Sequence, residues 1–373
     1  MQFIDLKAQY QALKEEINAN IQAVLDDGRY IGGPQVKELE EKLAAYVGRK
    51  HCISCANGTD ALQIAYMVYG IGEGDAVFCP DITFISSTEP SKMLGAVSVF
   101  CDIQPDTYNL CPESLERQIK AVLAEGKLTP KAVVAVDILG NPCDYDAIIP
   151  ICEKYGLILI EDAAQSFGAS YKGKKCCAFG QIATTSFFPA KPLGCYGDGG
   201  AIFTDDEELY LKMKSIRVHG SGSNRYDNVR LGMNGRMDTI QAAVVLAKLD
   251  IFEDELESRQ KVAAWYAEEL KDCLVLPETD PEYFSAWAQY TLKAKDEEER
   301  DRIIAGMKEK DIPVMIYYPI PLHEQTAYKN LGYEGVDLPY CSKVAKQVFS
   351  LPMHPYLKQE EVKYICDTLK TLI

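Results

Sequence analysis

The sequence predicts an α/β protein with a large domain built on a mostly parallel sheet and a smaller α/β domain after it. The chain has 373 residues, which is too long for one small core. Its N-terminal half alternates short apolar runs with helical patterns, as βαβ units do, and the pattern changes near residue 235. We expect a large domain over residues 1–245 and a small domain over 246–373, with an N-terminal segment able to pack on the small domain.

Short runs rich in apolar and β-branched residues predict the buried strands of the large domain. Their length and composition favour strand over helix. They lie at 76–79, 97–100, 132–136, 157–160 and 201–204. Between them, N-cap residue types followed by an apolar face predict helices. These helices lie at 59–66, 144–155 and 207–216.

The rest of the chain has a more helical pattern. One apolar stripe predicts a single long helix over 238–272. Its members are Ile240, Val244, Ala247 and Ile251. Two strand-like pieces and a closing helix follow at 288–294, 314–318 and 360–372.

Charge and the N-terminal sequence exclude several classes of protein. A net charge of -16 argues against a nucleic-acid partner, which needs a basic face. The first residues show no basic region followed by an apolar core, and no apolar run is long enough to span a membrane. We therefore expect a cytoplasmic protein without a membrane partner.

The cysteines predict no metal site. The 13 cysteines are scattered, which indicates reduced and mostly buried thiols. Cys52 and Cys55 have the spacing of a zinc pair, but a zinc site needs a second pair or nearby histidines. The chain has only 4 histidines, far apart, so we expect two buried strand cysteines instead.

A glycine-rich, apolar stretch over residues 186–200 contains a single lysine, Lys191. Burying an ammonium is costly unless its pKa falls or it is paired. A desolvated lysine is a better nucleophile toward carbonyl groups. The alternative interpretation is a surface lysine on a Pro/Gly loop.

Asp162 follows a predicted strand, where open α/β sheets place their ligands. Pyridoxal phosphate enzymes use such a pair, a lysine that forms a Schiff base and an acidic residue that keeps the pyridine nitrogen protonated. Glu161 would point to the opposite face if the strand continues through it. The alternative interpretation for Asp162 is an ordinary helix N-cap.

Gly58 and Thr59 stand at the start of a predicted helix. Free backbone N–H groups and the positive end of the helix dipole bind phosphate there, although a plain capped helix has the same pattern. The chain lacks the P-loop motif and the dinucleotide fingerprint. The chain thus combines, in this order, a phosphate-binding helix start, a strand-end aspartate, a serine (Ser186) and a lysine. This combination is more specific for a pyridoxal phosphate site than any one of its members.

At these residues the chain resembles the DegT/StrS family of sugar aminotransferases, which have the aspartate aminotransferase fold, fold type I of the pyridoxal phosphate enzymes. The resemblance runs almost from end to end. Within the family it is most similar to aminotransferases that act on UDP-2-acetamido-2-deoxy-3-oxo-glucuronate in the synthesis of surface polysaccharides such as lipopolysaccharide. The segments that carry it are Asn57-Gly58-Thr59-Asp60, Glu161-Asp162-Ala163-Ala164-Gln165-Ser166-Phe167-Gly168-Ala169 and Pro192-Leu193-Gly194-Cys195-Tyr196-Gly197-Asp198-Gly199-Gly200.

The resemblance implies a role for each matching cofactor residue. Lys191 holds pyridoxal 5'-phosphate and moves the proton, and Asp162 pairs with the pyridinium nitrogen. Phe84 stacks on the ring, and Gln165 lies near the ring hydroxyl. The phosphate contacts are Gly58, Thr59, Ser186 and, from the other subunit, Asn234. The last contact implies a homodimer with shared active sites.

The resemblance also implies which residues bind the sugar substrate. Arg236 would bind the sugar carboxylate, since a guanidinium fork suits a carboxylate. Tyr317 and Tyr318 lie on the sugar-side loop. The sequence departs from the family pattern at Tyr317, where many relatives have histidine, and over 137–141, which replaces a Leu-Tyr-Gly-Gln-like run.

The implied reaction moves an amino group from L-glutamate to C3 of the nucleotide-linked keto sugar, with 2-oxoglutarate as the second product and pyridoxamine phosphate as the intermediate form of the cofactor. The first alternative is a dTDP-linked 3- or 4-keto-6-deoxy sugar as substrate. A sugar dehydratase on the same fold would lack Lys191. A non-catalytic regulatory relative would have a broken site, whereas Lys191, Asp162, Gln165 and Ser186 are all present.

Overall fold

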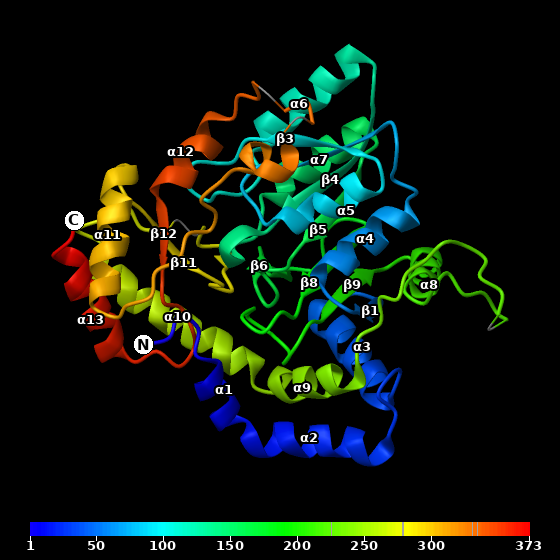
Figure 1. Ribbon diagram of the computed structural model, residues 1–373, viewed down its shortest axis with the longest axis horizontal. Helices are drawn as coiled ribbons and strands as arrows, with labels where there is room; N and C mark the ends of the chain where they lie inside the picture. Colours follow the sequence, from blue (N-terminus) through cyan, green and yellow to red (C-terminus); the bar gives the residue numbers. More distant parts are fainter. Residues whose placement is uncertain (225, 278–279, 330, 334) are drawn as a thin grey trace.

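A seven-stranded sheet lies at the centre of the large domain (Figure 1). The computed structural model describes residues 1–224, 226–277, 280–329, 331–333 and 335–373. The strands run in the order β1-β9-β8-β5-β4-β2-β3, and β9 alone among them is antiparallel to its neighbours. Their bounds in that order are His51–Cys55, Gly200–Thr204, Ile182–Ser186, Ile158–Asp162, Thr129–Val136, Asp75–Pro80 and Val97–Cys101.

Helices cover both faces of this sheet, as the alternation of side chains along each strand requires. On β4, Val134 packs into one core and Val133 into another. The first face is covered by α4 (Gly58–Val68), α5 (Glu89–Met93), α8 (Glu207–Ile216) and α12 (Pro339–Gln347). The second face is covered by α3 (Pro34–Val47), α6 (Pro112–Glu125), α7 (Tyr145–Tyr155) and α9 (Thr239–Leu249).

The strands and helices expected for the N-terminal half are confirmed to within a few residues. Cys52 and Cys55 are buried on β1, as expected. The strands expected from the sequence did not include β8, because its sequence Ile-Ala-Thr-Thr-Ser has little apolar content. β8 is important for the site, since it ends at Ser186, one of the expected phosphate contacts.

The small domain combines helices with a two-stranded antiparallel sheet. Its apolar core joins α10, α11 and α13 to the paired strands β11 and β12. Their bounds are Phe252–Leu270, Glu297–Glu309, Gln359–Lys370, Tyr290–Lys293 and Val348–Leu351. Shorter elements are β6 (Ser170–Tyr171), β7 (Lys174–Lys175), β10 (Tyr283–Phe284), η1 (Ile85–Ser87), η2 (Ile138–Gly140), η3 (Leu322–Glu324) and η4 (Thr326–Tyr328).

The expected single helix over 238–272 is wrong, because the chain forms α9 and α10 with a break at Asp250 and Ile251. α9 packs on the large domain, whereas α10 packs against α13. The first turn of α10 holds three acidic residues, which stabilise a helix N-terminus. Such a cluster marks a new helix start within the apolar stripe.

The expected strand over 314–318 is also wrong. Only Met315 forms a bridge there, to Ser350. Proline cannot donate to a ladder, and Pro313 and Pro319 flank the segment. The segment is therefore free to line a cavity instead of extending the sheet.

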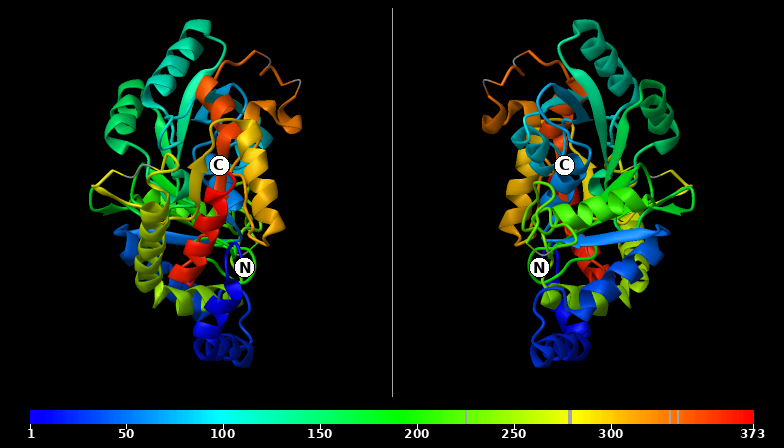
Figure 2. Two further views of the ribbon diagram at one scale, coloured as in Figure 1. Left: turned by 90° about the vertical axis from the view of Figure 1, so that its left-hand side faces the viewer. Right: turned by 90° about the vertical axis from the view of Figure 1, so that its right-hand side faces the viewer.

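The N-terminal helices α1 (Leu6–Ala12) and α2 (Lys14–Asp27) lie along the lower edge of the molecule in both views of Figure 2. Ile17 of α2 packs on Val244 and Ala247 of α9. The amide of Met353 donates to the carbonyl of Phe3, so the N-terminus also contacts the C-terminal part of the chain. Among the described helices, none combines the length and apolar character that crossing a membrane requires.

Candidate active site

A cavity of about 450 Å³ opens where β5, β8 and the start of α4 meet. In parallel sheets this edge, at the carboxyl ends of the strands, is where ligands bind. Residues 57–198 line most of the cavity, and Ile4, Gln289, Tyr317 and Tyr318 come from the parts of the chain on either side of this range. The cavity therefore brings together segments that are far apart in the sequence.

Lys191 lies in this cavity on a tightly folded loop after β8. The loop is held by hydrogen bonds from Phe187 N to Gly199 O at 2.7 Å and from Cys195 N to Phe187 O at 2.8 Å. Behind it, the buried Lys248 donates to Gly194 O at 2.6 Å. Burial lowers the pKa of Lys191 to about 8, and attraction by Asp162 partly opposes that shift. A group with this pKa can both accept and donate a proton near neutral pH.

Asp162 ends β5, and 5% of its surface is exposed. Ser87 Oγ donates to Asp162 Oδ2 at 2.9 Å, and Ala164 N donates to Oδ1 at 3.2 Å. Burial raises the pKa of Asp162, while these two donors and Lys191 favour its charged form. The arrangement presents a carboxylate to the cavity and supplies partners for its charge.

Glu161 lies on the opposite face of the sheet. Its carboxylate accepts from Cys177 N at 2.6 Å and from Phe179 N at 2.7 Å. It lies beside Asp137 and Cys176, with potential ligand atoms within 4.8 Å of one another. Asp137 in turn accepts from Tyr145 OH at 2.7 Å. These carboxylates are hydrogen-bonded parts of the core.

The start of α4 forms one end of the cavity. Asn57 caps the helix by accepting from Asp60 N at 2.7 Å. A Cβ at Gly58 would lie 2.8 Å from Ser186 Cβ, so only glycine allows the helix to approach β8 this closely. Thr59 Oγ1 and Ser86 Oγ lie 2.7 Å apart. Hydroxyl groups and a helix N-terminus together form an anion site.

Aromatic and amide side chains form the walls. Phe84 is 55% exposed, and its ring centroid lies 6.3 Å from that of Tyr318. Gln165 Oε1 accepts from Leu139 N at 2.7 Å, and Gln165 Nε2 donates to Tyr318 OH at 3.1 Å. Gln165 thus connects the end of β5 to the loop that carries Tyr317 and Tyr318.

The loop after Tyr318 is anchored to the end of β2 by Asp81, which is fully buried. Asp81 Oδ2 lies 2.6 Å from His323 Nδ1, and Asp81 Oδ1 accepts from His323 N at 2.9 Å. Leu322 N also donates to Asp81 O at 2.9 Å. Phe84 follows Asp81 closely in the sequence. Asp81 therefore links the segment that carries Phe84 to the loop that follows Tyr318.

This anchor predicts a pH-dependent contribution to stability. The Asp81 hydrogen bond raises the pKa of His323, and Glu324 Oε1, 3.6 Å from His323 Nε2, also favours the charged imidazole. A raised pKa stabilises the folded state below the ordinary histidine pKa and ceases to do so as pH rises through the raised value. His323→Asn keeps a donor but not the charge. The melting temperature of this variant should fall further below that of the wild-type protein near pH 6 than near pH 9. An equal decrease at the two pH values would contradict the charge effect.

The cavity brings together most of the residues predicted from the sequence. They are Gly58, Thr59, Phe84, Asp162, Gln165, Ser186, Lys191, Tyr317 and Tyr318. It also contains residues that the prediction missed, namely Ile4, Thr83, Ser86, Ser87, Phe188 and Gln289. Thr83, Ser86 and Ser87 follow the predicted strand 76–79, so their position offered a signal. Gln289 carried none.

Asn234 and Arg236 lie elsewhere in the same chain. They line a second cavity of about 490 Å³, which shares Asn57 and Asp198 with the first. Arg236 Nε is buried without a hydrogen-bond partner among the described residues. Its guanidinium therefore retains an unused donor.

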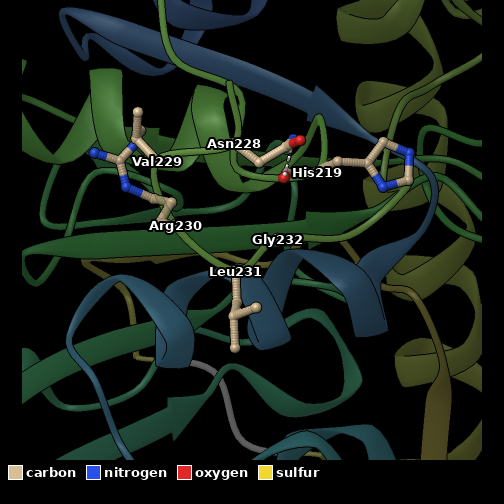
Figure 3. A pocket seen from close by; sticks show the side chains of 6 residues that line it. All are labelled: His219, Asn228, Val229, Arg230, Leu231 and Gly232. Carbon is tan, nitrogen blue, oxygen red and sulfur yellow. Dashed lines mark hydrogen bonds between the residues drawn. The ribbon is translucent and has the colours of Figure 1, made fainter. Parts of the chain in front are cut away.

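A third, open depression lies on the long loop between α8 and α9 (Figure 3). Asn228 Nδ2 donates to His219 O at 2.8 Å across it. Its lining consists of His219, Asn228, Val229, Arg230, Leu231 and Gly232, none of which lines the Lys191 cavity. The depression is thus separate from the candidate site.

Known proteins resemble this chain over almost its whole length. The sequence pattern of the DegT/DnrJ/EryC1/StrS aminotransferase family matches residues 11–370. The UDP-2-acetamido-2-deoxy-3-oxo-D-glucuronate aminotransferase of Pseudomonas aeruginosa is 49% identical over 372 residues, which cover 99% of each chain.

Solved structures agree with this match. A DegT DnrJ EryC1 StrS aminotransferase from Brucella abortus superposes with a TM-score of 0.96 at 48% identity, covering 100% of this chain and 99% of the other. The sugar aminotransferase Spr1654 from Streptococcus pneumoniae has been solved in a PMP-form and a PLP-form, with TM-scores of 0.90 and 0.88. Both are 27% identical to this chain, and each match covers 96% of both chains.

Proposed function

The chain belongs to the DegT/DnrJ/EryC1/StrS aminotransferase family, and from this premise we propose that it transfers an amino group from L-glutamate to C3 of UDP-2-acetamido-2-deoxy-3-oxo-glucuronate. It is a pyridoxal-phosphate-dependent sugar aminotransferase of fold type I. The 49% identity to the Pseudomonas aeruginosa enzyme over almost the whole chain supports this choice of sugar. We further propose a cytoplasmic location and a role in surface polysaccharide synthesis.

The residues of the Lys191 cavity fit pyridoxal phosphate. The cofactor has a phosphate, a pyridine nitrogen and an aldehyde, and the cavity offers a complementary group to each. The start of α4, with Gly58 packed against Ser186 and Thr59 beside Ser86, suits the phosphate. The carboxylate of Asp162 suits the nitrogen, and the amine of Lys191 suits the aldehyde.

When bound, pyridoxal phosphate supplies an electron sink that eases the loss of a proton from the carbon next to the transferred nitrogen. Lys191 Nζ first holds the cofactor and, once displaced, accepts that proton and returns it to the adjacent carbon of the cofactor. In the sugar half of the reaction Lys191 moves the proton in the opposite direction. Its pKa of about 8 suits both directions.

The surrounding residues hold the reactants in place for these transfers. Asp162 keeps a negative charge at the pyridine nitrogen, and Ser87 orients its carboxylate. Phe84 would cover one face of the ring, and Gln165 would lie near the ring hydroxyl. Tyr317 and Tyr318 would form the sugar side of the cavity, which Lys191 also lines.

We propose that two copies of the chain share their active sites. Asn234 and Arg236 line a cavity of their own chain that differs from the cavity around Lys191. In a homodimer, Asn234 of one copy would reach the cofactor phosphate of the other, and Arg236 would bind the carboxylate of the uronate. The unused Nε donor of Arg236 supports a carboxylate partner, because a guanidinium binds carboxylates through two parallel hydrogen bonds.

Arg236→Ala should raise the Michaelis constant for the uronate sugar roughly 10- to 100-fold, since a hydrogen bond to a charged group contributes about 1.5–3 kcal/mol. The turnover number should change far less. Arg302→Ala, which removes an exposed arginine of α11, serves as the matched control. An equal loss with a keto sugar that lacks a carboxylate would contradict the role of Arg236.

The decisive experiment for the proposed function is an amino-transfer assay with a panel of UDP- and dTDP-linked keto sugars and L-glutamate as donor. We expect the highest kcat/KM with the UDP-linked 3-oxo-uronate. Efficient transfer to a dTDP-linked 3- or 4-keto-6-deoxy sugar, with none to the uronate, would overturn the proposed substrate. Size measurement in solution tests the homodimer.

A further inference from the structure

Gln289 lies at the wall of the Lys191 cavity, directly before β11. Its segment is fixed to η2 of the large domain by hydrogen bonds to Gly140 O from Ala286 N at 2.8 Å and from Ser285 Oγ at 3.0 Å. A Cβ at Gly140 would lie 2.7 Å from Ala288 N, so glycine is required for this close approach. The backbone that carries Gln289 is therefore held firmly against the site.

Within the described part of the chain, the side-chain oxygen of Gln289 has no hydrogen-bond partner. Only 8% of the residue is exposed, and Oε1 is buried without a hydrogen bond among the described residues. Leaving a buried polar atom unpaired destabilises the folded protein, and most such atoms in proteins are paired. The other glutamine of the cavity, Gln165, uses both ends of its amide. Because Gln289 also lines the cavity, a ligand bound there is an available partner for its amide.

The position of Gln289 favours the sugar as this ligand. The groups that suit the cofactor, Asp162, Ser186 and Lys191, all come from the large domain, whereas Gln289 comes from the same part of the chain as Tyr317 and Tyr318. In the proposed substrate the reacting carbon is C3, and the acetamido group is on the adjacent carbon. When C3 lies at Lys191, the acetamido group must lie in this cavity as well.

We propose that Gln289 is a specificity-determining residue that hydrogen-bonds the 2-acetamido group of the sugar. A primary amide carries an acceptor and two donors, so it can accept from the N–H or donate to the carbonyl of a secondary amide. A hydroxyl group at the same carbon lacks that carbonyl, so it can make only the first of these contacts. This inference rests on the proposed function, because it takes the acetamido group from the proposed sugar.

The test compares two UDP-linked 3-amino-uronates, one with a 2-acetamido group and one with a 2-hydroxyl group, in the reverse reaction with 2-oxoglutarate. The wild-type protein should prefer the acetamido sugar. Gln289→Met, which keeps the length of the side chain but removes its amide, should reduce that preference about tenfold, the effect of one hydrogen bond of about 1.4 kcal/mol.

Gln347→Met is the matched control, because Gln347 is another buried glutamine with an unpaired Oε1 but lies outside the cavity. It should leave the preference unchanged. A folded Gln289→Met protein with the wild-type preference would overturn the inference and leave the proposed function standing. The same holds if its losses with both sugars are equal. Failure of the wild-type protein to use either sugar would instead overturn the proposed function.

Discussion

Replacing Lys191 with alanine should lower turnover by about four orders of magnitude, the upper end of what a positioned acid–base group supplies. The reason for so large an effect is that one amine has two tasks. In the mechanism that we propose, Lys191 Nζ is the nucleophile that holds the cofactor, and it is also the group that moves the proton in both halves of the reaction. The measurement is steady-state turnover, together with the visible absorption of the lysine-bound cofactor, which should disappear.

The matched control is Lys120→Ala, which removes an exposed lysine of α6 that pairs with Glu116 at 3.0 Å. That variant should keep its activity and its colour. Because burial already lowers the pKa of Lys191 to about 8, its ammonium contributes little to folding, and Lys191→Ala should remain folded. Near-wild-type turnover of a folded Lys191→Ala protein would show that another group performs the transfer.

Asp162→Asn should lower turnover by roughly 100- to 1000-fold, the range observed when one preorganised electrostatic partner is removed. Asparagine has nearly the same shape, and Ser87 Oγ can still hydrogen-bond its side-chain oxygen. The variant lacks the negative charge, so it no longer favours the protonated pyridine nitrogen on which the electron sink depends. The loss should fall on the turnover number, with a smaller change in the Michaelis constant for the sugar.

Asp146→Asn is a suitable control, because Asp146 is an exposed aspartate whose ion pair with Lys172 lies on the surface. Exposed pairs of this kind contribute about 0–1 kcal/mol to stability. Circular dichroism and thermal melts should show that Asp162→Asn is folded, since Ser87 keeps its acceptor and only the longer hydrogen bond from Ala164 N is lost. Unchanged turnover in that folded variant would remove Asp162 from the catalytic role.

The local sequence predicted much of the fold and of the site. Short apolar runs between helical patterns predicted the parallel sheet, because alternation of this kind is set by the faces that each element buries. Lys191 stood out as one lysine in a glycine-rich, apolar stretch, and Asp162 as a carboxylate at the end of a buried strand. Residue type and local position left an alternative open for each residue, and their combination with Gly58, Thr59 and Ser186, together with the family resemblance, favoured the cofactor interpretation.

Some elements required the structure. Beyond residue 238 the apolar stripe continues across Asp250, although α9 and α10 pack in different places. The period of the apolar residues shows which side of a helix is buried. It does not show which part of the protein packs on that side. The strand expected at 314–318 failed because a strand needs a partner along its length, and only Met315 finds one.

The sequence by itself predicted the class of fold, the lysine that we propose as the cofactor residue and the strand-end aspartate that we propose as its partner, since each depends on a short segment and its immediate chemistry. Only the tertiary structure decided which distant groups complete the site. Ser87 meets Asp162 across 75 positions of the chain, and His323 meets Asp81 across 242. The unpaired side-chain oxygen of Gln289 among the described residues and the separate cavity of Arg236 likewise follow from the packing of segments far apart in the chain, which no local pattern encodes.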